Sequence, residues 1–123
     1  MTPAAFVAAV LGCGFGAVIR FALSTLRREH HLPWPTLVAN LLGTFLLGAA
    51  GALLGNGTLS STAAFIVGGG VAGGLTTFST LAVDAVVMWR TSPRNAVLYV
   101  TITGVSGAGA GALGWVIASA LTA

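Results

Sequence analysis

The sequence predicts an all-α membrane protein with four transmembrane helices. Of its 123 residues, 56% are apolar and only 6% are charged, and the mean hydropathy is +0.99. A soluble domain usually carries about a quarter charged residues, because polar groups must cover most of its surface. Lipid must therefore be the solvent for most of this chain, and we expect a single transmembrane domain over residues 1–123.

The first two expected spans are separated by a charged segment. The first span covers about residues 2–26 and ends at the arginine- and histidine-rich run 27–31. The second covers about residues 33–54, with prolines on both sides of Trp34 at its start and a Gly-Asn-Gly turn after its end. Each stretch has the ~20 residues that a helix needs to cross the hydrocarbon core.

The third and fourth spans are expected at about residues 61–89 and 93–121. Trp34 and Trp89 lie towards span ends, where aromatic side chains favour the membrane interface. Tyr99 is assigned to the same aromatic belt, although it lies about one turn deeper.

The arginines are distributed unevenly among the loops. The loops 27–32 and 90–94 contain four of the five arginines, and Arg20 lies near the same end of its span, whereas the other side has no Lys or Arg. The positive-inside rule therefore predicts that both arginine loops are cytoplasmic and that both termini lie outside.

Several functional classes lack support in the sequence. The net charge of +3 does not come from a clustered basic face of the kind that binds nucleic acid. No paired carboxylates, nucleophile–histidine pair or phosphate loop is present, so we do not expect an enzyme. His30 and His31 lack metal-ligating companions.

Small residues spaced four apart predict close helix contacts. Such glycine pairs occur in the first, third and fourth spans, and they allow two backbones to approach each other closely. The pairs are Gly12 with Gly16, Gly70 with Gly74, and Gly107 with Gly111.

The third span contains the most informative segment. Residues 68–74 include five glycines, and four hydroxyl residues follow within 76–80. Because glycine weakens a helix by about 1 kcal/mol and Ser/Thr side chains can satisfy freed backbone groups, an interrupted helix is expected in mid-membrane. Broken helices direct carbonyl ends at cations and N–H ends at anions, which predicts an ion site near residues 73–78. A glycine-rich helix packed tightly against a neighbour is the alternative.

Three further polar residues lie within the spans. Asn40 fits either an interhelical hydrogen bond or a pore role. For Asp84 and Arg20, an ion pair or extension to the interface is favoured over a proton relay.

Three segments resemble a known family, the small bacterial fluoride channels of the Fluc/CrcB family. They are GAVIRF at 16–21, PTLVANLLGTFLLG at 35–48 and GGLTTFST at 73–80. The resemblance covers nearly the whole chain, and the order of the segments matches the family's spans.

The resemblance implies an antiparallel dimer with two fluoride pathways and a central structural Na⁺ in the bacterial plasma membrane. Asn40 matches the pore asparagine, and Phe78 the first phenylalanine of the pore-lining pair. Gly73 and Thr76 match the backbone carbonyls that hold Na⁺. The remaining expected site residues are Ser79, Thr80, Thr103 and Ser106 along the pathway and Arg20 in the vestibule. The implied function is passive export of cytoplasmic fluoride, which lowers its toxicity.

Two positions depart from the family pattern. Leu81 stands where a second phenylalanine is expected, and Gly107 where a second hydroxyl is expected. The one-sided arginines also disfavour insertion in both orientations, which a homodimer of opposed subunits requires. We therefore favour a heterodimer with an oppositely oriented homologue, in which one pathway is degenerate.

Two other functions remain open on the sequence. A small four-helix multidrug or cation antiporter also works as an antiparallel pair, but it needs a membrane-embedded carboxylate, and the first span contains no acid. A non-conducting assembly subunit of a heteromeric channel is the second alternative, and the departures at Leu81 and Gly107 favour it.

Overall fold

The computed structural model describes residues 2–26 and 33–123, and the elements within these ranges are all helical. Four segments are long and apolar enough to cross a membrane: Pro3–Ser24 (α1), Trp34–Gly55 (α2), Ser61–Thr91 and Pro93–Leu121 (α6). Each corresponds to one expected span. The loop 27–32, which was assigned to the cytoplasm, lies outside the described residues.

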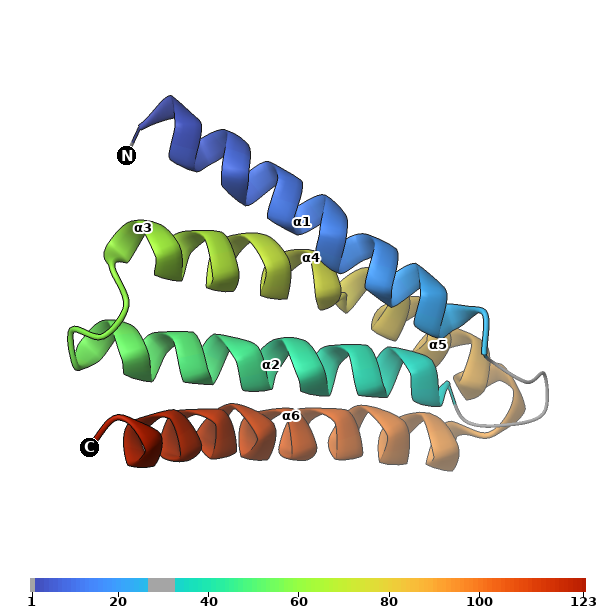
Figure 1. Ribbon diagram of the computed structural model, residues 1–123. Helices are drawn as coiled ribbons and strands as arrows, with labels where there is room; N and C mark the ends of the chain where they lie inside the picture. The colour runs from blue at the N-terminus through green and yellow to red at the C-terminus, as the bar shows by residue number, and fades with distance from the viewer. Residues whose placement is uncertain (1, 27–32) are drawn as a thin grey trace.

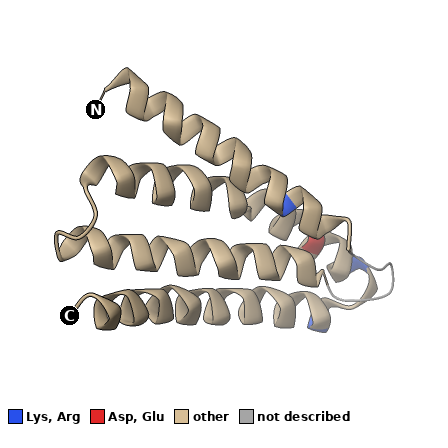
Figure 2. Cartoon of the chain, viewed as in Figure 1, with Lys and Arg blue, Asp and Glu red and all other residues tan. Residues whose placement is uncertain are grey.

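The helices form an up-and-down bundle with both termini at the same end (Figure 1). α2 and α6 lie side by side along their length, and α6 packs mainly against α2. α1 packs across the third crossing. The charged residues of the described ranges lie towards the end opposite the termini (Figure 2).

The third crossing is built from four pieces. It begins with α3 (Ser61–Ala64), continues as a π-helix, η1 (Phe65–Ala72), and as α4 (Gly73–Leu75), and ends with α5 (Phe78–Thr91). The wide turns of η1 were not expected from the sequence, although single π turns are frequent at functional positions.

Two residues between α4 and α5 leave the helical conformation. Thr76 has φ −81° and ψ 153°, and Thr77 has φ −149° and ψ 124°. Both are extended, so the helix ends with the bond from the Thr76 N–H to the Ala72 carbonyl oxygen, at 3.0 Å, and a new helix starts at Phe78. This interruption, residues 76–77, is called the break below.

Glycines set the two tightest helix contacts. On the α1 side, a Cβ built on Gly16 would overlap the backbone of Val71, and a Cβ built on Gly74 would overlap that of Cys13. In the other contact, a Cβ on Gly48 of α2 would overlap the carbonyl oxygen of Gly111 in α6. The pairs Gly12/Gly16 and Gly70/Gly74 therefore lie at helix contacts as expected. Gly107 is looser, because its Cβ would meet only Thr44 Oγ1, at 3.9 Å.

Candidate ion site at the helix break

Asn40 of α2 pairs with the backbone at the break. Its Nδ2 donates to the carbonyl oxygen of Thr77 at 3.2 Å, and its Oδ1 accepts the N–H of Thr77 at 2.7 Å. In a membrane no water is at hand to satisfy backbone groups that leave a helix, so another part of the protein must do so. Asn40 supplies both a donor and an acceptor to one residue of the break.

The Thr77 side chain starts the next helix. Its Oγ1 accepts the N–H of Thr80 at 3.2 Å, which is the usual N-cap contact. The same hydroxyl lies 3.3 Å from Ser79 Oγ and donates to Thr80 Oγ1 at 3.2 Å. The N-terminus of α5, with its partial positive charge, is thus surrounded by hydroxyl groups.

A polar hollow opens beside this N-terminus. Its volume is about 370 Å³. The residues that line it come from α1, from the start of α2 and from residues 77–80: Ala17, Arg20, Phe21, Ser24, Pro35, Thr36, Thr77, Ser79 and Thr80. Among the described residues of this lining, Arg20 is the one charged side chain. A guanidinium, several hydroxyl donors and a helix N-terminus all favour an anion in the hollow.

The residues just after the break are exposed. Phe78 is 81% exposed, and Ser79 and Thr80 are also exposed. An aromatic ring and two hydroxyl groups are therefore presented together on an open face of the chain.

Of the two carbonyls expected to hold Na⁺, that of Gly73 lies in α4 before the break and that of Thr76 lies within the break. Gly73 is exposed, and Thr76 is half-buried. Thr76 Oγ1 donates to the carbonyl oxygens of Ala72, at 3.0 Å, and of Gly73, at 3.4 Å. Within residues 2–26 and 33–123, no hydrogen bond is found to the carbonyl oxygen of Thr76. Oxygen ligands at the negative end of a helical segment suit a hard cation.

The structure does not bring the two α6 residues into the polar hollow. Thr103 is buried, and its Oγ1 has no hydrogen-bond partner within the described parts of the chain. The Ser106 hydroxyl donates back to the carbonyl oxygen of Ile102 in the preceding turn. Unpartnered buried hydroxyl groups are uncommon in proteins.

A buried network was missed in the sequence analysis. The carboxylate of Asp84 in α5 accepts hydrogen bonds from Thr36 Oγ1 in α2, at 3.3 Å, and from Tyr99 OH in α6, at 3.5 Å. Asp84 is only 6% exposed, so extension to the interface, one of the two expectations for it, was wrong, while the other, an ion pair with Arg20, stays a prediction. Tyr99 is 3% exposed, so its assignment to an aromatic belt was also wrong. The sequence gives no sign of the three-helix meeting point that creates this network.

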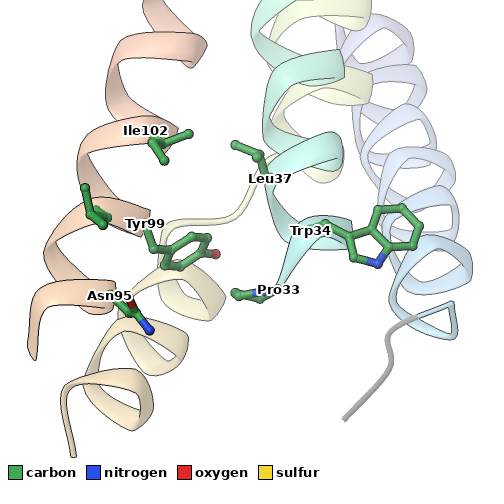
Figure 3. A pocket seen from close by; sticks show the side chains of 7 residues that line it. Pro33, Trp34, Leu37, Asn95, Tyr99 and Ile102 are labelled. Carbon is green, nitrogen blue, oxygen red and sulfur yellow. The ribbon is translucent and has the colours of Figure 1, made fainter. Parts of the chain in front are cut away.

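The ring of Tyr99 also forms one wall of an apolar pocket of about 160 Å³ between the start of α2 and α6 (Figure 3). Pro33, Leu37 and Ile102 line the same pocket. Its apolar lining favours hydrocarbon, and the pocket is distinct from the polar hollow.

Four apolar crossings, one of them interrupted beside a polar hollow, define a small multi-pass membrane protein. Residues 7–115 match the model of the family described as "CrcB-like protein, Camphor Resistance (CrcB)". The chain therefore belongs to the CrcB family.

Curated relatives agree with this assignment. The chain is 35% identical over 114 residues to the "Fluoride-specific ion channel FluC" of Renibacterium salmoninarum, with 85% of this chain and 90% of the relative covered. It is 34% identical over 122 residues to "Fluoride-specific ion channel FluC 2" of Halalkalibacterium halodurans, with coverages of 92% and 84%. It is 45% identical over 71 residues to "Fluoride-specific ion channel FluC 1" of Streptococcus pneumoniae, with coverages of 58% and 62%. The family is one of ion channels and not of enzymes.

Proposed function

We propose that this chain is a subunit of a fluoride-selective channel that lets cytoplasmic fluoride leave the cell passively. The observation that carries the proposal is the break between α4 and α5, where the polar hollow with Arg20 adjoins the N-terminus of α5. The names of the curated relatives support fluoride as the anion.

The chemistry of the proposed pathway suits a small, tightly hydrated anion. Fluoride gives up its water only to other donors, and Asn N–H and Ser/Thr O–H groups are such donors. The positive edge of the Phe78 ring can face the ion without forming a strong bond. Neutral donors bind weakly enough to release the ion, as conduction requires. Along α6, Thr103 and Ser106 would continue the pathway, and the unpartnered hydroxyl of Thr103 supports this role.

The open face after the break supports a second subunit. Exposed Ser79 and Thr80 hydroxyls in a membrane crossing are costly against lipid tails, and the exposed Phe78 ring lies beside them. In the proposed antiparallel dimer, the partner covers this face, and the pathway runs between the subunits.

The same dimer would contain a structural Na⁺ between the two breaks. The carbonyl oxygens of Gly73 and Thr76 from each subunit would hold it, and the Thr76 carbonyl, which accepts no hydrogen bond from the described residues, fits this ligand set. When bound, the cation supplies positive potential beside the anion pathway and joins the two interrupted crossings.

The distribution of arginines supports a fixed orientation and hence a heterodimer. Arg20 lies in the second half of α1, Arg90 at the end of α5 and Arg94 at the start of α6. Figure 2 shows the described Lys and Arg positions towards the end opposite both termini. We propose that this end is cytoplasmic, in the bacterial plasma membrane. A chain with a single orientation can form an antiparallel pair only with a homologue of opposite bias. The names FluC 1 and FluC 2 among the relatives fit paired chains.

Export through such a channel needs no coupling to ATP or protons. Hydrogen fluoride crosses membranes as a neutral molecule and ionises in a less acidic cytoplasm. A negative membrane potential then drives the anion outward, at about 2.3 kcal/mol per 100 mV.

Efflux from liposomes tests the proposal. The chain is purified alone and with a co-expressed homologue, reconstituted, and assayed with fluoride and chloride electrodes under a K⁺/valinomycin potential. We expect fast fluoride efflux and no chloride efflux from the co-expressed sample. Absence of fluoride efflux from every sample would refute the channel, and Na⁺-dependent fluoride efflux from the chain alone would refute the heterodimer.

A further inference from the structure

The carboxamide of Asn40 matches the backbone of Thr77 as one peptide group matches another. Because Thr77 is extended, its N–H and C=O point to the same side, as they do in a β-strand. Asn40 meets both, with Oδ1 at 2.7 Å from the N–H nitrogen and Nδ2 at 3.2 Å from the carbonyl oxygen. The two bonds therefore recognise the extended conformation of Thr77, since a helical residue directs these two groups in opposite directions.

Gly43 of α2 allows Asn40 to come close to the break. A Cβ built on Gly43 would overlap the Thr76 side chain and would lie 3.2 Å from the carbonyl oxygen of Ala72. The absence of a side chain at Gly43 therefore helps α2 to approach the break closely. One turn after Asn40, Thr44 donates its hydroxyl to the Asn40 carbonyl oxygen.

A residue of each proposed ion site is bonded directly to Thr77, the residue that Asn40 holds. Thr76, whose carbonyl oxygen has no hydrogen bond within the described ranges, precedes Thr77 directly. Phe78 follows it directly, and the Thr77 hydroxyl caps α5 through the N–H of Thr80. The orientation of the Thr77 backbone therefore determines where the Thr76 oxygen and the Phe78 ring point.

We infer that Asn40 is a positioning residue that latches the break in its extended form and so couples the cation site to the anion pathway. This inference rests on the proposed function, and it is additional to any contact between Asn40 and fluoride. Asn40 does not act as a Na⁺ ligand here. Substitution of Asn40 should nevertheless raise the Na⁺ concentration that is needed to slow amide exchange at the break.

The hold of Asn40 on the break, called the latch below, can be tested without a transport assay. Hydrogen–deuterium exchange is measured by mass spectrometry over residues 73–80 on the assembled protein in nanodiscs. Asn40→Leu keeps the shape of the side chain but removes donor and acceptor, whereas Asn40→Asp keeps only the acceptor for the Thr77 N–H. Thr44→Val is the matched control, because it removes a neighbouring hydroxyl that does not touch the break.

We expect the Thr77 amide to exchange at least about fivefold faster in Asn40→Leu than in the wild type, as follows from the loss of one ordinary hydrogen bond. Asn40→Asp should lie between the two, and Thr44→Val should resemble the wild type. Equal exchange in Asn40→Leu and Thr44→Val would overturn the latch. If Asn40→Leu fails to assemble, wild-type exchange of the Phe78 amide in Asn40→Asp would overturn it as well, because this amide shares a peptide plane with the Thr77 carbonyl that loses its donor.

A Na⁺ titration of the same exchange tests the coupling. We expect Na⁺ to slow amide exchange over residues 73–80 in the wild type. In Asn40→Asp, the Na⁺ concentration at the midpoint of this slowing should be about fivefold higher. Identical midpoints would refute the coupling. A wild-type protein without fluoride efflux but with these exchange differences would instead refute the proposed function and leave the latch in place.

Discussion

Gly74 of α4 and Cys13 of α1 meet backbone to backbone, because a Cβ built on Gly74 would overlap the carbonyl oxygen of Cys13. The contact lies two residues before the break. α1 therefore supports the break from one side, while Asn40 and Gly43 of α2 support it from another. Two extended residues between helices are easily disrupted. Here the close approach of α1 and α2 holds them in place.

Substitution of Gly74 by alanine is expected to destabilise the protein. The added methyl group meets backbone atoms, which cannot move aside as the end of a side chain can, and overpacking of this kind costs about 1–3 kcal/mol. The matched control is Gly14→Ala, since a Cβ at Gly14 has no neighbour within 4 Å and alanine favours the helix. In thermal unfolding in detergent, the midpoint temperature should fall below that of the wild type for Gly74→Ala but not for Gly14→Ala. Equal midpoints for the two variants would contradict the close contact.

Substitution of Phe78 by isoleucine tests the proposed pathway. Isoleucine keeps the apolar character but lacks the positive ring edge, so we expect fluoride efflux to fall by up to about tenfold, as the strength of such edge contacts implies. Phe15→Ile is the control, because Phe15 is also exposed, at 62%, but lies on α1 away from the break. Unchanged efflux in Phe78→Ile would favour a non-conducting assembly subunit.

Neutralising Arg20 should slow fluoride entry from the polar hollow. A focused positive charge raises the local concentration of an anion, so Arg20→Gln is expected to reduce efflux by about tenfold at low ionic strength. The difference should shrink in 0.1 M salt, where the screening length is about 10 Å. Arg94→Gln, at the same end of the bundle but outside the hollow, is the control. A reduction that does not depend on salt would argue against this electrostatic role.

The sequence predicted the parts of the fold that depend on local patterns. Four apolar stretches of sufficient length gave four crossings, and glycines four apart marked the contact of α1 with the third crossing. The run of glycines and hydroxyl residues at 68–80 indicated the segment that carries the extended residues Thr76 and Thr77.

Features that depend on the meeting of distant helices could not be predicted. The Asp84 network joins α2, α5 and α6, and no spacing in the sequence relates Thr36, Asp84 and Tyr99. The pairing of Asn40 with the Thr77 backbone likewise requires an approach that only Gly43 permits. A lone polar residue in a span shows that a partner is needed, but not which atom supplies it.

Substitution of Asp84 by asparagine separates the channel from an antiporter. A proton-coupled antiporter would lose transport entirely, because the amide cannot carry the proton. In a channel, an amide oxygen can still accept the hydrogen bonds from Thr36 and Tyr99, so we expect fluoride efflux to persist with a loss of stability of about 1–3 kcal/mol. Efflux and thermal unfolding are measured on the same preparation. Complete loss of transport in a protein of unchanged stability would favour the antiporter.

A serine at position 107 should restore a hydroxyl that the α6 pathway lacks. Gly107 has room for a side chain, since its Cβ would lie 3.9 Å from Thr44 Oγ1, and it follows Thr103 by one turn of α6. Gly107→Ser is expected to speed fluoride efflux by a few-fold, in line with a weak neutral donor added to a pathway.

Gly107→Ala separates the hydroxyl from the backbone effect, because both substitutions remove the same glycine and favour the helix by up to about 1 kcal/mol. If the pathway beside α6 conducts and is limited at position 107, serine accelerates efflux and alanine does not. If the pathway on this chain is degenerate for another reason, such as the missing aromatic ring at Leu81, both variants conduct like the wild type. The double variant Gly107→Ser with Leu81→Phe then distinguishes one missing group from two, because only the double variant would gain fluoride efflux.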